Sequence, residues 1–175
     1  MSNNQINILA RESVKAIVPY ASARRSMSGG AIWLNANENA LAPEYTLSGS
    51  FNRYPSCQPA AVINGYARYA GVTAEQVLVS RGADEGIELL IRSFCEPGQD
   101  SITICPPTYG MYAISAQSHQ TAINTVLLKP DFTLDLPGIF ATRPKLVFIC
   151  SPNNPTGDII PRQQIIDVLE HFKDQ

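Results

Sequence analysis

Short apolar runs alternate along the chain with segments whose apolar residues recur at the spacing of a helix face. The runs are of strand length and rich in β-branched residues, which predicts strands at 77–79, 101–105, 123–128 and 145–150. Strands that alternate with helices are typical of a parallel sheet with right-handed crossovers. The pattern from residue 59 onward therefore predicts an α/β fold, mainly a parallel sheet with flanking helices.

Helices are predicted wherever the apolar residues form a stripe. The stripes consist of Ile63, Tyr66, Ala67 and Ala70, of Ile87, Leu90, Ile91 and Phe94, of Tyr109, Tyr112, Ala113 and Ala116, and of Ile165, Val168, Leu169 and Phe172. A short helix is predicted at 134–141, and Gly71 is placed to end the first helix. Residues 1–32 are interpreted as an N-terminal arm with a helical start at 9–17.

Composition and charge exclude several classes of function. The formal net charge is −2 and no run of Lys or Arg occurs, so nothing favours a nucleic-acid partner. The apolar runs are too short to span a membrane, and the N-terminus lacks the pattern of a signal peptide, so we expect a cytoplasmic protein. The four cysteines are widely spaced and neither histidine lies near one, which favours reduced, buried thiols over a zinc site.

The predicted strand at 145–150 leads into a loop that reads Ser-Pro-Asn-Asn-Pro-Thr-Gly at 151–157. In open parallel sheets, ligands bind just past the carboxyl ends of the strands, so this position favours a binding loop. Asn, Pro and Gly also dominate ordinary turns for local backbone reasons. The residue types alone leave both interpretations open.

The segment 82–86, Gly-Ala-Asp-Glu-Gly, joins the predicted strand at 77–79 to a helix. The free N–H groups and the dipole at a helix N-terminus bind phosphate well. The segment is neither a Walker loop nor a dinucleotide-binding turn, since their motifs are absent. Simple capping by acidic residues in a first turn is the alternative, and the residues alone do not decide between the two.

The loop at 151–157 resembles that of the pyridoxal-phosphate aminotransferases of fold type I. Four further segments follow in that family's order and resemble histidinol-phosphate aminotransferases, namely Trp-Leu-Asn-Ala-Asn-Glu-Asn at 33–39, Arg-Tyr-Pro at 53–55, Ser-Arg-Gly-Ala-Asp-Glu-Gly at 80–86 and Pro-Pro-Thr-Tyr-Gly-Met-Tyr at 106–112. The resemblance covers only the first half of such an enzyme. It implies that 1–32 belong to a small domain, and that 33–175 are the truncated N-terminal portion of the large domain that binds the cofactor.

The resemblance also implies roles for single residues at a pyridoxal 5'-phosphate site. The backbone amides of Ala83, Asp84 and Glu85 would hold the phosphate, and both carboxylates would then have to point away from it. Tyr109 would stack on the pyridine ring, although periodicity alone favours core packing with Tyr112. Asn154 would donate to the phenolic oxygen of the cofactor, with a cis bond to Pro155 fixing its direction, while Asn153 would be a turn residue.

Three further residues are assigned by resemblance. Tyr54 would reach the phosphate in the partner subunit, which implies a homodimer, although a surface aromatic is the simpler interpretation of the residue alone. Tyr20 and Asn37 would line the mouth of the substrate site.

The implied reaction transfers an amino group between histidinol phosphate and 2-oxoglutarate, giving glutamate, in histidine biosynthesis. It needs a lysine that forms the Schiff base, and no lysine of this chain matches the family's position, so the catalytic residue is absent and we expect the isolated chain to be inactive. Two alternatives remain: a related fold type I aminotransferase or decarboxylase with another amino substrate, and a truncated product without catalysis.

Overall fold

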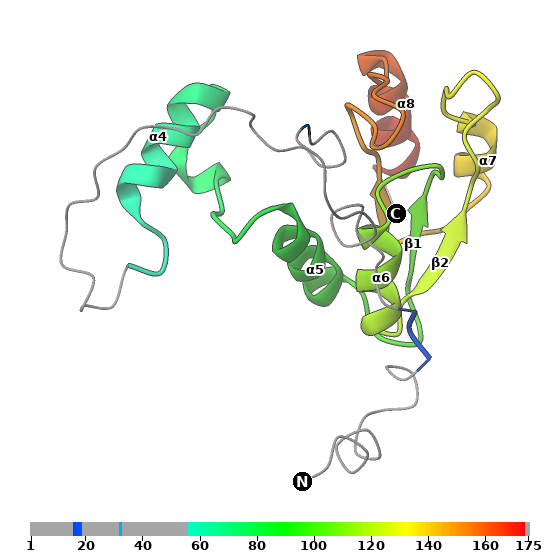
Figure 1. Cartoon of the computed structure of the whole chain (residues 1–175), viewed down its shortest axis with the longest axis horizontal. Coiled ribbons are helices and arrows are strands. Elements are labelled where there is room, and N and C mark those ends of the chain that lie inside the picture. Colours follow the sequence, from blue (N-terminus) through cyan, green and yellow to red (C-terminus); the bar gives the residue numbers. More distant parts are fainter. Residues whose placement is uncertain (1–15, 19–31, 33–55, 174–175) are drawn as a thin grey trace, which may run out of the picture. The chain divides into compact units, whose positions relative to one another are not determined.

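The computed structural model describes residues 16–18, 32 and 56–173 (Figure 1). Residues 56–82 belong to one compact unit and residues 83–173 to another. Apart from residues 16–18 and 32, the predicted arm lies outside the described residues, and so does nearly all of its helical start at 9–17. No helix in the part of the chain that the structure describes is long and apolar enough to cross a membrane.

The smaller unit contains helix α4 (Ala60–Ala70) and the short 3-10 helix η1 (Ala74–Gln76). Gly71 ends α4 in the left-handed conformation, with φ of 69°, as the sequence predicts. The predicted strand at 77–79 is wrong. The main chain of Val79 instead exchanges two hydrogen bonds, of 2.8 and 2.9 Å, with the side-chain amide of Gln58, so a side chain occupies the bonding positions that a neighbouring strand would use.

The larger unit is built on a parallel sheet of strand order β2-β1-β3, with β1 (Ser101–Ile104) between β2 (Ala122–Thr125) and β3 (Leu146–Phe148). The strands at three of the four predicted places are thereby confirmed, although each is shorter than predicted. The ladder ends early because Pro106 and Pro107 follow β1 almost at once and have no N–H to donate.

Helices cover both faces of this sheet (Figure 1). Helices α5 (Ala83–Phe94) and α6 (Met111–Ser118) pack on one face, while α7 (Leu136–Phe140) and α8 (Arg162–Phe172) pack on the other. Ile102 and Ile104 point to the first layer, whereas Cys105 belongs to the second. The alternation is that of strands buried on both faces, which confirms the predicted fold class.

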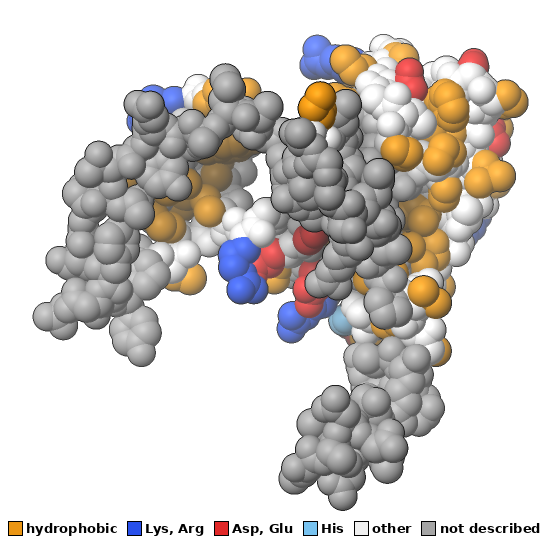
Figure 2. Space-filling view, viewed as in Figure 1, with side chains coloured by type: hydrophobic (Ala, Val, Ile, Leu, Met, Phe, Trp, Pro, Cys, Tyr) orange, Lys and Arg blue, Asp and Glu red, His pale blue; other side chains and the backbone are white. Residues whose placement is uncertain are grey.

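The predicted helical stripes are only partly buried. Ile87 and Ile91 of α5 are in the core, but Leu90 and Phe94 of the same stripe are 45% and 54% exposed. Tyr66 of α4 and Leu169 of α8 are exposed as well. Figure 2 shows such hydrophobic side chains on the visible face of the larger unit. The predicted stripes of α4, α5 and α8 are thus wider than the surfaces against which these helices pack.

Candidate functional site at the carboxyl ends of the strands

Two loops leave the sheet side by side, because β1 and β3 are neighbouring parallel strands. Residues 105–110 follow β1 and residues 149–158 follow β3. The first loop contains the cis prolyl bond Pro106–Pro107, and the second contains Ser151–Pro152 and Asn154–Pro155. The cis bond before Pro155 is the one expected from the sequence. The carboxyl edge of the sheet is therefore lined by the two segments in which Tyr109 and Asn154 lie.

The side chain of Asn153 joins the two loops. Its amide nitrogen donates to the carbonyl oxygen of Pro107 at 2.9 Å and to Oγ1 of Thr156 at 3.0 Å. Its amide oxygen accepts a 2.9 Å hydrogen bond from the hydroxyl of Thr108. Asn153 is buried, with 5% of its surface exposed, which confirms that it is a turn residue bonded to the backbone.

Tyr109 lies just before α6, not within it, since the helix begins at Met111. Its ring meets the ring of Tyr112 edge-on, with centroids 5.8 Å apart and an angle of 89° between the planes. Its hydroxyl donates a 2.7 Å hydrogen bond to Oδ1 of Asp84 in the first turn of α5. Tyr109 therefore combines core packing on one side with a polar contact to a third element of the site.

Ala83, Asp84 and Glu85 form the first turn of the 12-residue helix α5. The first N–H groups of a helix have no intrahelical acceptor, and the helix dipole makes this end positive. The carboxylate of Asp84 is turned toward the hydroxyl of Tyr109. Gly82 before the helix has φ of 99°, a conformation that favours glycine. The first turn of α5 is thus held beside the loop that follows β1.

Asn154 is exposed, in contrast to its neighbour Asn153. Among the described residues, its side chain has no hydrogen-bond partner. A buried side-chain amide, that of Asn153, is thus followed directly by an exposed one, that of Asn154.

Burial suppresses the ionisation of the groups behind this edge. It raises the pKa of the Cys105 thiol to about 11, with a smaller contribution from the negative charge of Asp135. Burial, followed by a hydrogen bond with Cys150, also raises the pKa of Tyr112. Cys105 and Tyr112 therefore stay neutral and contribute to packing. The exposed side chain at this edge, that of Asn154, is better suited to contact a ligand.

The sequence-predicted site residues fall into two groups. The structure brings Asp84 and Tyr109 into contact and places Asn154 on the adjacent loop. Tyr54, Tyr20 and Asn37 lie outside the described residues. Sequence reasoning missed Thr108 and the side chain of Asp84, since a contact 25 residues apart leaves no local pattern to find.

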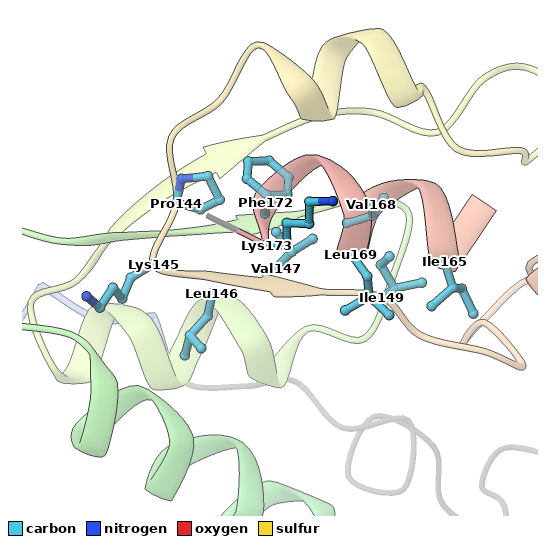
Figure 3. Close-up of a pocket in the computed structure, with 10 residues that line it drawn as sticks. All are labelled: Pro144, Lys145, Leu146, Val147, Ile149, Ile165, Val168, Leu169, Phe172 and Lys173. Carbon is cyan, nitrogen blue, oxygen red and sulfur yellow. The ribbon is translucent and has the colours of Figure 1, made fainter. Parts of the chain in front are cut away.

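A separate apolar groove of about 400 Å³ lies between β3 and α8 (Figure 3). It is lined by Pro144, Lys145, Leu146, Val147, Ile149, Ile165, Val168, Leu169, Phe172 and Lys173. Lys145 precedes β3 and so marks the amino end of that strand. Ile149 is the one residue that the groove shares with the two loops at the carboxyl edge.

The fold and the loops at its carboxyl edge define a class of protein. The chain belongs to the family Aminotransferase class I and II, which matches residues 31–175. This finding confirms the fold type that the sequence analysis assigns by resemblance.

Within this family, the chain is similar to several histidinol-phosphate aminotransferases. The histidinol-phosphate aminotransferase of Pseudoalteromonas atlantica is 56% identical over 98% of this chain and 48% of its own length. The crystal structure of the histidinol-phosphate aminotransferase from Clostridium acetobutylicum is 28% identical, with a TM-score of 0.54 over 62% of this chain and 32% of its own. The crystal structure of the histidinol-phosphate aminotransferase from Sinorhizobium meliloti in complex with pyridoxal-5'-phosphate is 22% identical, with a TM-score of 0.57 over 63% of this chain and 31% of its own. At this identity the similarity concerns the fold alone. The chain spans about half the length of the curated relatives it matches.

Proposed function

We propose that this chain supplies part of the pyridoxal 5'-phosphate site of a histidinol-phosphate aminotransferase. The observation that supports the proposal is that Tyr109 contacts the first turn of α5, while Asn154 lies on the neighbouring loop at the same sheet edge. The 56% identity to a relative of that name supports the substrate assignment. The whole enzyme's reaction would transfer an amino group between histidinol phosphate and 2-oxoglutarate.

The donors at this edge fit the chemical groups of the cofactor. A phosphate is dianionic and suits the amides of Ala83, Asp84 and Glu85 at the positive end of α5. A planar pyridine ring suits the half-buried face of Tyr109. A phenolate oxygen suits the exposed amide of Asn154. When bound, pyridoxal phosphate supplies an electron sink for bond breaking at the amino substrate.

The residues of this chain would each perform one task. The α5 amides fix the phosphate end of the cofactor, and Tyr109 limits its tilt by contact with the ring. Asn154 donates to the phenolic oxygen, which favours its ionised form and lowers the pKa of the group conjugated with it. The hydroxyl of Tyr109 would hold the carboxylate of Asp84 by the hydrogen bond between them.

Tyr54, Tyr20 and Asn37 complete the proposal from outside the described residues. Tyr54 would bind the phosphate of the partner subunit in a homodimer, while Tyr20 and Asn37 would contact the substrate. Mixed dimers of a Tyr54→Phe protein and a protein without its Schiff-base lysine test this assignment, and verified mixed dimers without recovered activity would contradict it.

We expect none of the described lysines to take the Schiff-base role, because none of them matches the position at which the resemblance expects that lysine. The backbone N–H of Lys145 bonds to Ser101 at the amino end of the sheet, 2.7 Å away, and Lys173 lines the groove beside α8. Lys129 follows β2 and is exposed. We therefore expect the 175-residue chain by itself to bind the cofactor without covalent attachment and to be inactive in transamination.

The test joins this chain to the remaining half of the Pseudoalteromonas atlantica relative and measures glutamate formation from 2-oxoglutarate. Histidinol phosphate should be the preferred amino donor over phenylalanine and threonine phosphate, and the 175-residue chain alone should give only the rate of free pyridoxal phosphate. Preference for another donor would assign a different substrate. Glutamate formation by the isolated chain above the free-cofactor rate would contradict the assignment of the missing lysine.

A further inference from the structure

The two successive asparagines of the loop at 151–157 occupy opposite environments. Asn153 is buried and bonded on every side, whereas Asn154 is exposed. The family resemblance gives a ligand-binding role to Asn154 and none to Asn153 beyond that of a turn residue. The structure shows why an asparagine, and not another turn residue, stands at 153.

Every polar group of Asn153 has a partner within the two loops. Both amide hydrogens are used, one on the carbonyl oxygen of Pro107 and one on Oγ1 of Thr156. The amide oxygen accepts from Thr108. The backbone N–H donates to the carbonyl oxygen of Asp158 at 2.8 Å, and the backbone carbonyl accepts from Gly157 at 2.6 Å.

These bonds act on the residues next to the proposed ligand contacts. Pro107 and Thr108 immediately precede Tyr109, and Asn153 itself precedes Asn154. A shift of the loop after β1 would break the bonds to Pro107 and Thr108 together. The buried amide would then keep only its bond to Thr156, which is costly. The side chain of Asn153 therefore links the segment that carries Tyr109 directly to the segment that carries Asn154.

We propose that Asn153 is a positioning residue that sets Tyr109 and Asn154 at the spacing the cofactor requires. The inference rests on the proposed function, because it names which residue prearranges that site. Asn153 does not itself contact the ligand in this proposal. It acts through the two residues beside it in the chain and in space.

A purely structural role is the alternative, and a matched asparagine separates the two. Asn124 of β2 donates from its side-chain amide to the hydroxyl of Ser101 at 3.0 Å, so it also bridges two segments of the sheet. Ser101 begins β1, at the end of the sheet away from the loops. The same amide also lies 3.4 Å from the hydroxyl of Thr103, so substitution of Asn124 removes side-chain amide contacts between strands without touching the proposed site.

The experiment uses the 175-residue chain with Asn153→Asp and Asn124→Asp. Asn153→Asp keeps the size of the side chain but replaces both donors by an oxygen that faces the carbonyl of Pro107. Two quantities are measured for each variant: hydrogen exchange at the amides of Thr108, Tyr109 and Gly110, and the dissociation constant for pyridoxal phosphate from fluorescence titration. The unfolding temperatures of both variants are also measured, so that their losses of stability can be compared.

We expect Asn153→Asp to speed exchange at Tyr109 and to weaken pyridoxal phosphate binding by about tenfold or more. Asn124→Asp should lower the unfolding temperature to a similar extent and change the dissociation constant by less than about twofold. Equal binding by the two variants, with unchanged exchange at Tyr109, would overturn the proposal. Thr108→Val removes only the bond to the amide oxygen, so it gives the same comparison, at a smaller amplitude, if Asn153→Asp fails to fold.

Failure of the proposed function gives a different pattern. If the unsubstituted chain binds no pyridoxal phosphate, the cofactor assignment fails for this chain. The exchange measurement then decides the positioning role alone: faster exchange at Tyr109 in Asn153→Asp supports it, and unchanged exchange overturns it.

Discussion

The hydroxyl of Tyr109 donates a 2.7 Å hydrogen bond to Oδ1 of Asp84, a residue 25 positions earlier in the chain. This bond connects the loop after the central strand with the first turn of α5. The phosphate-binding end of the proposed site is thereby held to its ring-binding part. The bond also gives the negatively charged carboxylate of Asp84 a neutral partner, next to the first turn of α5, where the phosphate of the cofactor would bind.

Asp84→Ala should loosen Tyr109 and weaken pyridoxal phosphate binding several-fold, since a hydrogen bond to a charged group contributes about 1.5–3 kcal/mol and exposure reduces that amount. Asp84→Asn keeps an acceptor oxygen at the same position and should retain most of the affinity. Fluorescence titration of the two variants, together with Tyr109→Phe and the Asp84→Ala/Tyr109→Phe double variant, measures the effect. If the losses of Asp84→Ala and Tyr109→Phe simply add in the double variant, the two residues do not act through their mutual bond.

Asn154→Ala in the protein extended to the length of its relatives should raise the pKa seen in the absorbance of the bound cofactor, on the order of one unit. The reason is the loss of a donor to the phenolate, which leaves the ionised form less stable. Turnover should also slow. A spectrophotometric titration with an unchanged or lowered pKa would count against the assigned contact.

The buried thiol of Cys105 should make the larger unit less stable at alkaline pH. Burial raises its pKa from 9.0 to about 11 in the folded protein, so the folded state holds the proton that the unfolded chain releases. The contribution is fully present below pH 9 and is lost as pH rises through about 11, with a total on the order of 2–3 kcal/mol. Urea unfolding at pH 8 and pH 10.5 should show a smaller decrease for Cys105→Ala than for the unsubstituted chain.

Helix α5 offers a matched pair that tests the observed packing. Ile91 has no exposed surface, whereas Leu90 is 45% exposed although both belong to the predicted stripe. Ile91→Ala should cost about 2–5 kcal/mol of unfolding free energy through lost burial and the cavity it leaves. Leu90→Ala should cost less than about 1 kcal/mol. Equal losses in denaturant unfolding would show that α5 packs through the wider predicted stripe.

The sheet could be predicted from the sequence because its information is local. Strands such as β1 (Ser101–Ile104) are rich in β-branched residues, and prolines follow β1 at 106 and 107. The parallel α/β architecture follows from the alternation of such strands with helices. The strand predicted at 77–79 failed for the opposite reason. A strand exists only with a neighbour, and here the amide of Gln58 occupies that position.

The candidate site was predictable only as far as its motifs reach. Asn154 and Tyr109 lie in strings that resemble a known family, and the fold brings their loops together at adjacent strands. The bonds of Asn153 with Pro107 and of Asp84 with Tyr109 join residues distant in sequence, and no local pattern encodes them. The distinction between a buried and an exposed asparagine at 153 and 154 likewise depends on tertiary packing.

The position of bound pyridoxal phosphate on this chain is the most direct test of the account. Titration of the isotope-labelled 175-residue chain, followed by amide chemical shifts, reports that position residue by residue. The account predicts the largest changes at Ala83, Asp84, Glu85, Tyr109 and Asn154, with the groove between β3 and α8 unaffected. Changes centred on that groove, at Val147, Ile165 and Leu169, or no saturable change at any residue, would contradict it.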